Sequence, residues 1–173
     1  MHVVQSKLIQ IYSNLANAAS LLWHAYKSLP SPSNQVNWAG ESSFGEPFPL
    51  LETGTDTAQS GFYVLDKSSD KSQLILGPFQ GKVACQTIPF GRGVCGAGAQ
   101  DKQTQLVKNV DEFPGHIACD GDSKSEIVVP ILDGEGKVAA IIDVDCAELD
   151  GFDEVDQKWL EDLSALLTRS CDW

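Results

Sequence analysis

Basic residues are scarce in this chain of 173 residues: Lys and Arg together number 12, against 24 Asp and Glu. The formal net charge is −12 and the isoelectric point is near 4.4. Nucleic acids and anionic membranes attract surfaces that are rich in Lys and Arg. The charge balance therefore argues against both as partners.

Long hydrophobic runs are also missing. No stretch approaches the roughly 18–20 apolar residues that cross a bilayer, and Met1–Asn14 lacks the continuous apolar core and the cleavage site of a secretory signal. With 42% hydrophobic and 21% charged residues, the chain has the composition of one globular domain. We expect a soluble protein of the cytoplasm, with the nucleus as an alternative location.

The five cysteines are an odd number and too sparse for the disulfide framework of a small secreted domain. In a cytoplasmic chain they are expected to be reduced, and a disulfide among them is more often catalytic or redox-sensing than structural. Cys85, Cys95 and Cys119 lie in polar, glycine-rich surroundings. Cys146 and Cys171 fall on an apolar strand and on the last helix, where a thiol is usually a small buried side chain.

The hydrophobic pattern predicts an α+β fold. Apolar residues recur at helical spacing over 3–28 and again after a capping signal at Asp153, and the turn 133–136 joins two strands as a hairpin. The predicted strands are Gly61–Asp66, Gln73–Gly77, Lys82–Ile88, Glu126–Leu132 and Lys137–Asp145. We expect a central antiparallel sheet with the N- and C-terminal helices packed on one face.

The segment 41–61 does not fit this pattern, because it has four acidic residues, no Lys or Arg, and no periodicity. A structureless connection of this length is uncommon in compact domains. It separates Asn37–Gly40 from Phe62, which would otherwise continue as one strand. We interpret it as an atypical insertion in a single domain over 1–173, and the pattern fits either a surface loop or an unnatural junction such as a retained short intron.

Two motifs indicate cofactor or metal sites that their context does not support. Gly91–Gly96 satisfies G-x-G-x-x-G, but a dinucleotide site requires a preceding strand and a following βαβ crossover, so the glycines are expected to form a tight turn around Cys95. Cys85, Cys95, His116 and Cys119 make a Cys₃His set suited to zinc. The wide spacing of Cys85 and Cys95 is unlike the close pairs of structural zinc sites, so we expect no bound metal.

Thiol redox chemistry explains the three clustered cysteines better. A cysteine becomes nucleophilic where a cation, a helix N-terminus or backbone donors favour the thiolate. Cys119 follows His116 and precedes a glycine turn, and Cys95 lies in the glycine-rich loop. Thiols on separate loops suit a nucleophile with resolving partners, in which a sulfenic acid becomes a disulfide. Spacing alone leaves open whether Cys119 or Cys95 is the nucleophile.

Acidic residues form a second candidate site. Asp143 and Asp145 share one face of a predicted strand, with Ile142 and Val144 on the opposite face. Glu126 begins the preceding strand of the same hairpin. Such a carboxylate cluster can bind an ammonium group or hold a proton for general-acid catalysis. The alternative is that these acids lie at a solvated strand end.

Five motifs occur in a fixed order along the chain: Asn37–Gly40 (NWAG), Gly77–Cys85 (GPFQGKVAC), Gly91–Gly96 (GRGVCG), Pro114–Asp120 (PGHIACD) and Ser125–Pro130 (SEIVVP). In this order they closely resemble the free methionine-(R)-sulfoxide reductases, a family of single GAF-domain enzymes. The resemblance covers nearly the whole chain except 41–61, and the closing stretch Phe152–Leu167 is similar to the end of other GAF domains.

The resemblance implies a GAF-like fold and reduction of free methionine-(R)-sulfoxide to methionine, in defence against oxidative stress. By similarity Cys119 is the nucleophile, Cys85 and Cys95 are resolving candidates, and Cys95 is the alternative nucleophile. The implied substrate-binding residues are the acids Glu126, Asp143 and Asp145, which hold the ammonium group and help to protonate the sulfoxide oxygen, and the aromatic residues Trp38 and Tyr63 at the methyl-thio end.

The implied reductant is thioredoxin, which draws on NADPH through thioredoxin reductase, and no bound cofactor or metal is expected. The oligomeric state stays open, with a homodimer as one option. Two other functions remain as alternatives: a non-catalytic GAF sensor that binds a small ligand, and a Cys₃His zinc module.

Overall fold

The computed structural model describes residues 2–36, 59–81, 84–117, 119 and 121–173. Within these residues six strands form one antiparallel sheet in the order β3-β2-β1-β6-β5-β4. The strands are β1 (Gln59–Leu65), β2 (Gln73–Gln80), β3 (Thr87–Pro89), β4 (Gln105–Val107), β5 (Ser125–Leu132) and β6 (Val138–Cys146). Two short 3₁₀ helices, Ser33–Gln35 and Val110–Glu112, lie in the connections.

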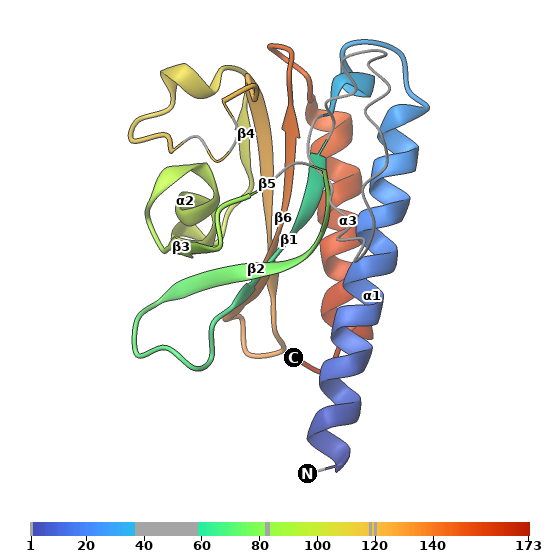
Figure 1. Cartoon of the computed structure of the whole chain (residues 1–173), viewed down its shortest axis with the longest axis vertical. Helices are drawn as coiled ribbons and strands as arrows, with labels where there is room; N and C mark the ends of the chain where they lie inside the picture. The colour runs from blue at the N-terminus through green and yellow to red at the C-terminus, as the bar shows by residue number, and fades with distance from the viewer. Residues whose placement is uncertain (1, 37–58, 82–83, 118, 120) are drawn as a thin grey trace, which may run out of the picture.

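Two long helices cover one face of the sheet. α1 (His2–Lys27) and α3 (Glu154–Ser170) lie side by side there (Figure 1). The Asp153 side chain accepts the N–H groups of Val155 and Asp156, and the Asp156 side chain accepts the Asp153 N–H in return, so a capping box fixes the start of α3. A buried core fills the space between helices and sheet, and it includes Leu15, Ala19, Phe62, Ile127, Val129, Ile142, Val144, Leu160 and Leu167.

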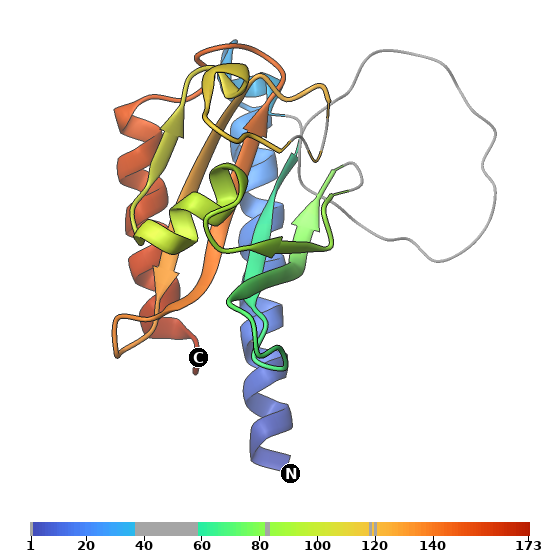
Figure 2. The same ribbon diagram turned by 90° about the vertical axis from the view of Figure 1, so that its left-hand side faces the viewer.

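A short helix, α2 (Gly93–Asp101), packs on the opposite face of the sheet, where Figure 2 shows it in front of the strands. A Cβ added at Gly96 would lie 2.5 Å from the Pro89 carbonyl oxygen, and one at Gly98 would lie 2.9 Å from Val128 Cγ1. Glycine at these positions lets the helix approach the chain and the sheet this closely. A second core forms beneath α2, with Tyr63, Leu74, Val94, Ala99, Val128 and Ile141 among its members.

The overall architecture confirms the sequence prediction. The fold is α+β, the sheet is antiparallel, and the two terminal helices share one face. The predicted hairpin is also present, since β5 pairs with β6 and the Asp133 side chain accepts the N–H groups of Glu135 and Lys137 in the turn. Every helix in the described part of the chain is too short or too polar to cross a bilayer.

Three local predictions are corrected by the structure. Of the strand expected over Lys82–Ile88, residues 82–83 lie outside the described structure, residues 84–86 are not in a strand, and β3 begins only at Thr87. The expected turn is present only at the start of Gly91–Gly96, where Gly91 and Gly93 have positive φ, and from Gly93 onward the segment continues as α2. Residues Gln59–Gly61, which fell inside the expected insertion, form the start of β1 and pair with β6.

Candidate active site

A cavity opens between α2, the sheet and two connecting loops. The space between its walls, counted together with the part that is open to solvent, is about 510 Å³. Its walls include all three of the cysteines expected to be reactive and all three acids expected to bind substrate, together with His116 and Arg92. The lining residues from these groups are Cys85, Cys95, Cys119, Glu126, Asp143 and Asp145. The structure thus joins the two candidate sites of the sequence into one.

Sheet register places the carboxylates. In the β5–β6 pair Glu126 lies opposite Asp145 and Val128 lies opposite Asp143, so the three acids share the face that α2 covers. Ile142 and Val144 point to the α1 and α3 side, as the alternation predicts. Glu126 and Asp143 are each only 5% exposed, so this is a buried acid pair rather than a solvated strand end.

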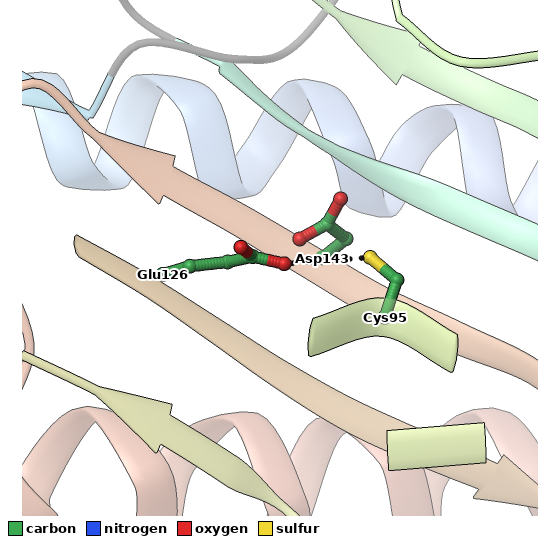
Figure 3. Close-up of side chains that lie close together, drawn as sticks. All are labelled: Cys95, Glu126 and Asp143. Carbon is green, nitrogen blue, oxygen red and sulfur yellow. Dashed lines mark hydrogen bonds between the residues drawn. The ribbon is translucent and has the colours of Figure 1, made fainter. Parts of the chain in front are cut away.

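Cys95 completes a buried cluster with two of these acids. It is the third residue of α2 and is 7% exposed. Its thiol donates a hydrogen bond to Glu126 Oε1 at 3.5 Å, and Figure 3 shows the sulfur pointing toward both carboxyl groups. Within the described structure Asp143 Oδ1 has no hydrogen-bond partner although it is buried. A buried acceptor without a donor is costly, so this position favours a ligand that donates.

Burial controls the protonation of the cluster. Burial raises the pKa of the Cys95 thiol well above its usual value, and the charges of Asp143 and Glu126 raise it further. Burial likewise raises the pKa of Glu126 well above that of an ordinary carboxyl group and the pKa of Asp143 to about 6. The cluster therefore retains protons near neutral pH, and Cys95 is a protonated thiol there.

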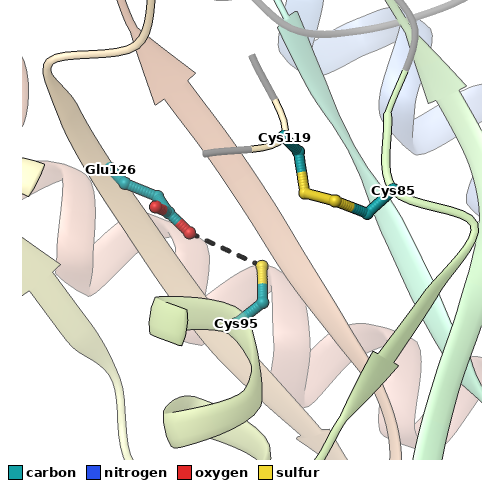
Figure 4. Close-up of a disulfide and its surroundings, with 4 residues drawn as sticks. All are labelled: Cys85, Cys95, Cys119 and Glu126. Carbon is teal, nitrogen blue, oxygen red and sulfur yellow. Dashed lines mark hydrogen bonds between the residues drawn. A yellow bond between two sulfur atoms is a disulfide. The ribbon is translucent and has the colours of Figure 1, made fainter. Parts of the chain in front are cut away.

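The other two clustered cysteines form a disulfide. Cys85 precedes β3 and Cys119 precedes β5, and their Cα atoms lie 5.3 Å apart (Figure 4). Cys119 is exposed at the wall of the cavity, whereas Cys95 is a free thiol beside Glu126. Cys146 and Cys171 are buried free thiols in the core under α1 and α3, as expected for cysteines outside the site.

The aromatic pair expected at the substrate is only partly described. Trp38 lies outside the described residues. Tyr63 is 1% exposed and belongs to the core beneath α2. Burial raises the pKa of its hydroxyl, and the charges of Cys95 and Asp143 raise this pKa further. The Tyr63 side chain therefore lies near the acid cluster.

His116, which the sequence suggested as a zinc ligand and as a neighbour of Cys119, lies in the wall of the cavity. Its Nδ1 is buried without a hydrogen-bond partner among the described residues. Desolvation lowers the pKa of the imidazole, which is therefore neutral at pH 7.

The disulfide removes Cys85 and Cys119 from the Cys₃His set in this state. The antiparallel pairing of every described strand also excludes a βαβ dinucleotide site there.

Comparison with known proteins assigns first the class and then the family. Residues 50–170 match the family model described as "GAF domain". The free methionine-R-sulfoxide reductase of Saccharomyces cerevisiae is 51% identical over 91% of this chain and 74% of its own length. The free methionine-R-sulfoxide reductase of Escherichia coli is 40% identical over 76% of this chain and 79% of its own length. The X-ray structure of the Neisseria meningitidis free methionine-R-sulfoxide reductase in complex with its substrate shares 37% identity, covers 92% of this chain and 77% of its own, and has a TM-score of 0.71.

The fold and the cavity therefore define a GAF domain with a thiol site. The chain belongs to the free methionine-R-sulfoxide reductase family.

Proposed function

We propose that this protein reduces free methionine-(R)-sulfoxide to methionine with the cavity thiols. The observation that carries this proposal is the Cys85–Cys119 disulfide at the wall of a cavity that also contains the Cys95, Glu126 and Asp143 cluster. Family membership supplies the substrate class, and the geometry supplies groups for each chemical step. Repair of oxidised methionine under oxidative stress is the role that this activity would serve.

The acids explain why a free amino acid would be bound. A free substrate carries an α-ammonium group, which a methionine inside a polypeptide has lost to the peptide bond. Asp143 Oδ1 is a buried acceptor that lacks a donor among the described residues, and Glu126 and Asp145 lie on the same face. An ammonium group at this position would supply both the missing hydrogen bond and the opposite charge. By family resemblance Trp38 and Tyr63 would contact the methyl-thio end.

The reaction divides between Cys119 and Cys85. The Cys119 thiolate attacks the sulfoxide sulfur while the oxygen takes a proton from the acid cluster, where burial raises the pKa of Glu126 well above that of an ordinary carboxyl group. Methionine leaves, and Cys119 remains as the sulfenic acid. The Cys85 thiol then attacks the sulfenic sulfur, releasing water and forming the disulfide of this structure.

Cys95 is less suited to be the nucleophile. The thiolate is the reactive form of cysteine, and burial beside two carboxyl groups raises the Cys95 pKa. Cys119 is exposed and already paired with Cys85. We therefore assign attack to Cys119 and resolution to Cys85, with Cys95 as a second resolving thiol.

The proposed reductant is thioredoxin, which would reduce the Cys85–Cys119 disulfide and be recycled with NADPH by thioredoxin reductase. The exposed position of Cys119 gives an attacking thiol access to one of the two sulfurs. This coupling requires a reducing compartment, so we place the protein in the cytoplasm, with the nucleus as the alternative.

Coupled turnover tests the proposal. We expect NADPH consumption in the presence of thioredoxin, thioredoxin reductase and the R epimer of free methionine sulfoxide, and none with the S epimer. Cys119→Ser should abolish turnover because it removes the attacking sulfur, whereas Cys171→Ser, which changes a buried thiol outside the cavity, should leave it intact.

Other outcomes discriminate among the alternatives. Cys85→Ser combined with Cys95→Ser removes both resolving thiols, so this variant should still release one equivalent of methionine per chain and accumulate the Cys119 sulfenic acid, which is detected by trapping and mass spectrometry. Activity that survives Cys119→Ser but not Cys95→Ser would reassign the nucleophile. Binding of the sulfoxide without turnover by the reduced protein would contradict the enzyme and favour a GAF sensor.

A further inference from the structure

The buried cluster of Cys95, Glu126 and Asp143 has the composition and spacing of a metal site as well as of an acid site. One ligand atom from each residue lies within 4.8 Å of the others, and the Cys95 Sγ–Glu126 Oε1 distance is 3.5 Å. Two ligands on a tetrahedral zinc, with Zn–S near 2.3 Å and Zn–O near 2.0 Å, are separated by about 3.5 Å. The Cys95 sulfur and the Glu126 oxygen are thus already at the distance of two zinc ligands. A modest shift of the Asp143 carboxylate would bring in the third ligand.

The charge of the cluster points to the same ligand. The Cys95 thiol and the carboxyl groups of Glu126 and Asp143 all become anions when they lose a proton, and each of these residues is less than one-tenth exposed. Asp143 Oδ1 has no hydrogen-bond partner within the described structure. Buried charges persist only when they are paired or coordinate a metal. A divalent cation would displace the protons of the cluster, offset two of the three negative charges that result, and supply a partner for the vacant acceptor oxygen.

We infer that Cys95, Glu126 and Asp143 form a Zn²⁺ site that overlaps the ammonium-binding part of the cavity, so that zinc inhibits the enzyme reversibly. The thiolate selects zinc over Mg²⁺ and Ca²⁺, which prefer oxygen ligands. On binding, the Cys95 thiol exchanges its proton for the metal and the proton passes to solvent. A fourth position stays open to water. The overlap with substrate rests on the proposed function, whereas the three ligands do not.

Cobalt titration of the oxidised protein tests the ligands directly. With the Cys85–Cys119 disulfide intact, those two sulfurs cannot bind metal, so a thiolate signal can come from Cys95. We expect one Co²⁺ per chain, a sulfur-to-cobalt charge-transfer band in the near ultraviolet, and displacement of the cobalt by Zn²⁺. Cys95→Ser should remove the band and weaken zinc binding by more than the roughly 10- to 100-fold that loss of a second-shell partner costs.

Two variants separate ligation from folding. Asp143→Asn keeps the shape of the side chain and should weaken zinc binding while the thiolate band persists at saturating cobalt. Cys171→Ser changes a buried thiol in the other core and should leave both the band and the affinity unchanged. Far-ultraviolet circular dichroism of each variant confirms that the fold is retained.

Competition tests the overlap with substrate. Free methionine-(R)-sulfoxide should raise the apparent Kd for zinc, and a chelator should restore turnover to zinc-inhibited enzyme.

An oxidised protein without the charge-transfer band would overturn the inference. So would binding that requires reduction and is lost in Cys85→Ser but not in Cys95→Ser, because that pattern places the metal on the reduced Cys85 and Cys119 thiols and not on the buried cluster. An intact cobalt spectrum with no turnover on any sulfoxide would refute the proposed function and leave the metal site standing.

Discussion

Asp143 combines burial, an oxygen that lacks a partner among the described residues and a pKa near the physiological range. It is 5% exposed, lies beside both Cys95 and Glu126, and keeps one oxygen without a donor within the described structure. Burial raises its pKa from 3.8 to about 6, so it changes charge close to physiological pH. The same carboxyl group is therefore able to accept an ammonium group when ionised and to supply a proton when neutral.

The raised pKa of Asp143 predicts a particular dependence of stability on pH. Between about pH 4 and pH 6 the folded protein holds this proton and the unfolded chain releases it, so stability falls as pH rises through this window and then levels off. A pKa raised from 3.8 to about 6 corresponds to about 3 kcal/mol. The side chain introduced by Asp143→Asn cannot titrate. Over this pH window the free energy of unfolding of the variant should therefore fall by up to about 3 kcal/mol less than that of the wild type.

Denaturant unfolding at pH 4, 5, 6 and 7 measures the difference. Asp162→Asn removes a carboxylate from the exposed face of α3 and controls for the change in net charge. An Asp143→Asn variant that follows the wild-type pH profile would show that Asp143 does not hold the proton.

At the scale of elements, α2 determines where the buried thiol lies. Its close approach depends on Gly96, whose backbone N–H donates to Arg92 O and whose carbonyl accepts from Gly91 N–H. The helix packs over β5 and β6, and this contact brings Cys95 to Glu126 on β5. A shift of α2 would therefore change the thiol–acid distance before it changed the sheet.

Gly96→Ala tests this arrangement. The new Cβ would lie 2.5 Å from the Pro89 carbonyl oxygen, and backbone atoms give way less readily than side-chain ends. Overpacking of this kind typically costs about 1–3 kcal/mol, which outweighs the gain of roughly 1 kcal/mol from replacing glycine by alanine in a helix. We expect a lower free energy of unfolding and a faster alkylation of Cys95.

Gly134→Ala is the matched control, because nothing lies within 4 Å of an added Cβ in that turn. It should change stability by less than about 0.5 kcal/mol. A Gly96→Ala protein as stable as this control, with unchanged Cys95 reactivity, would contradict the role of the close approach.

The elements that the sequence predicted arise from local patterns, whereas those that it did not predict arise from tertiary packing. The terminal helices and the β5–β6 hairpin follow from local periodicity and capping, which the sequence displays directly. α2 contains three glycines, and sequence reasoning assigned glycines to a turn. In the structure two of them permit close packing, a tertiary effect without a local signal. β4 is only three residues long and gains its partner, β5, from later in the chain.

The site was predictable in composition but not in pairing. Motif residues identified the three thiols and three acids, and alternation placed Asp143 and Asp145 on one face. That Cys85 pairs with Cys119 while Cys95 joins the acids depends on how β3, α2 and the loop before β5 meet in space. Such contacts between distant segments are not encoded in any spacing.

At the scale of the whole molecule, β1 connects the segment 41–61 to the cavity. β1 pairs Gln59 with Asp145 and Gly61 with Asp143, and Tyr63 follows on the same face. If residues 41–61 were removed, Gly40 would precede Phe62 and take the register of Gly61. Trp38 would then take the register of Gln59, opposite Asp145 and on the strand face that Tyr63 shares.

A variant that lacks residues 41–61 should therefore bind substrate more tightly. An added aromatic contact contributes about 0.5–1.5 kcal/mol, so we expect KM for free methionine-(R)-sulfoxide to fall roughly two- to tenfold. Trp38 fluorescence should also respond to substrate, and a Trp38→Phe version of the same variant should not respond. Equal KM values with and without the segment would refute this prediction.

The division of the molecule by its sheet has a practical consequence. Both ends of the chain leave from α1 and α3, on the face opposite α2 and the cavity (Figures 1 and 2). A reporter or a second domain joined at either end would start on the other side of the sheet from α2. A small amino acid and a thiol reductant would keep their access, so this fold is suited to fusion as a genetically encoded sulfoxide sensor.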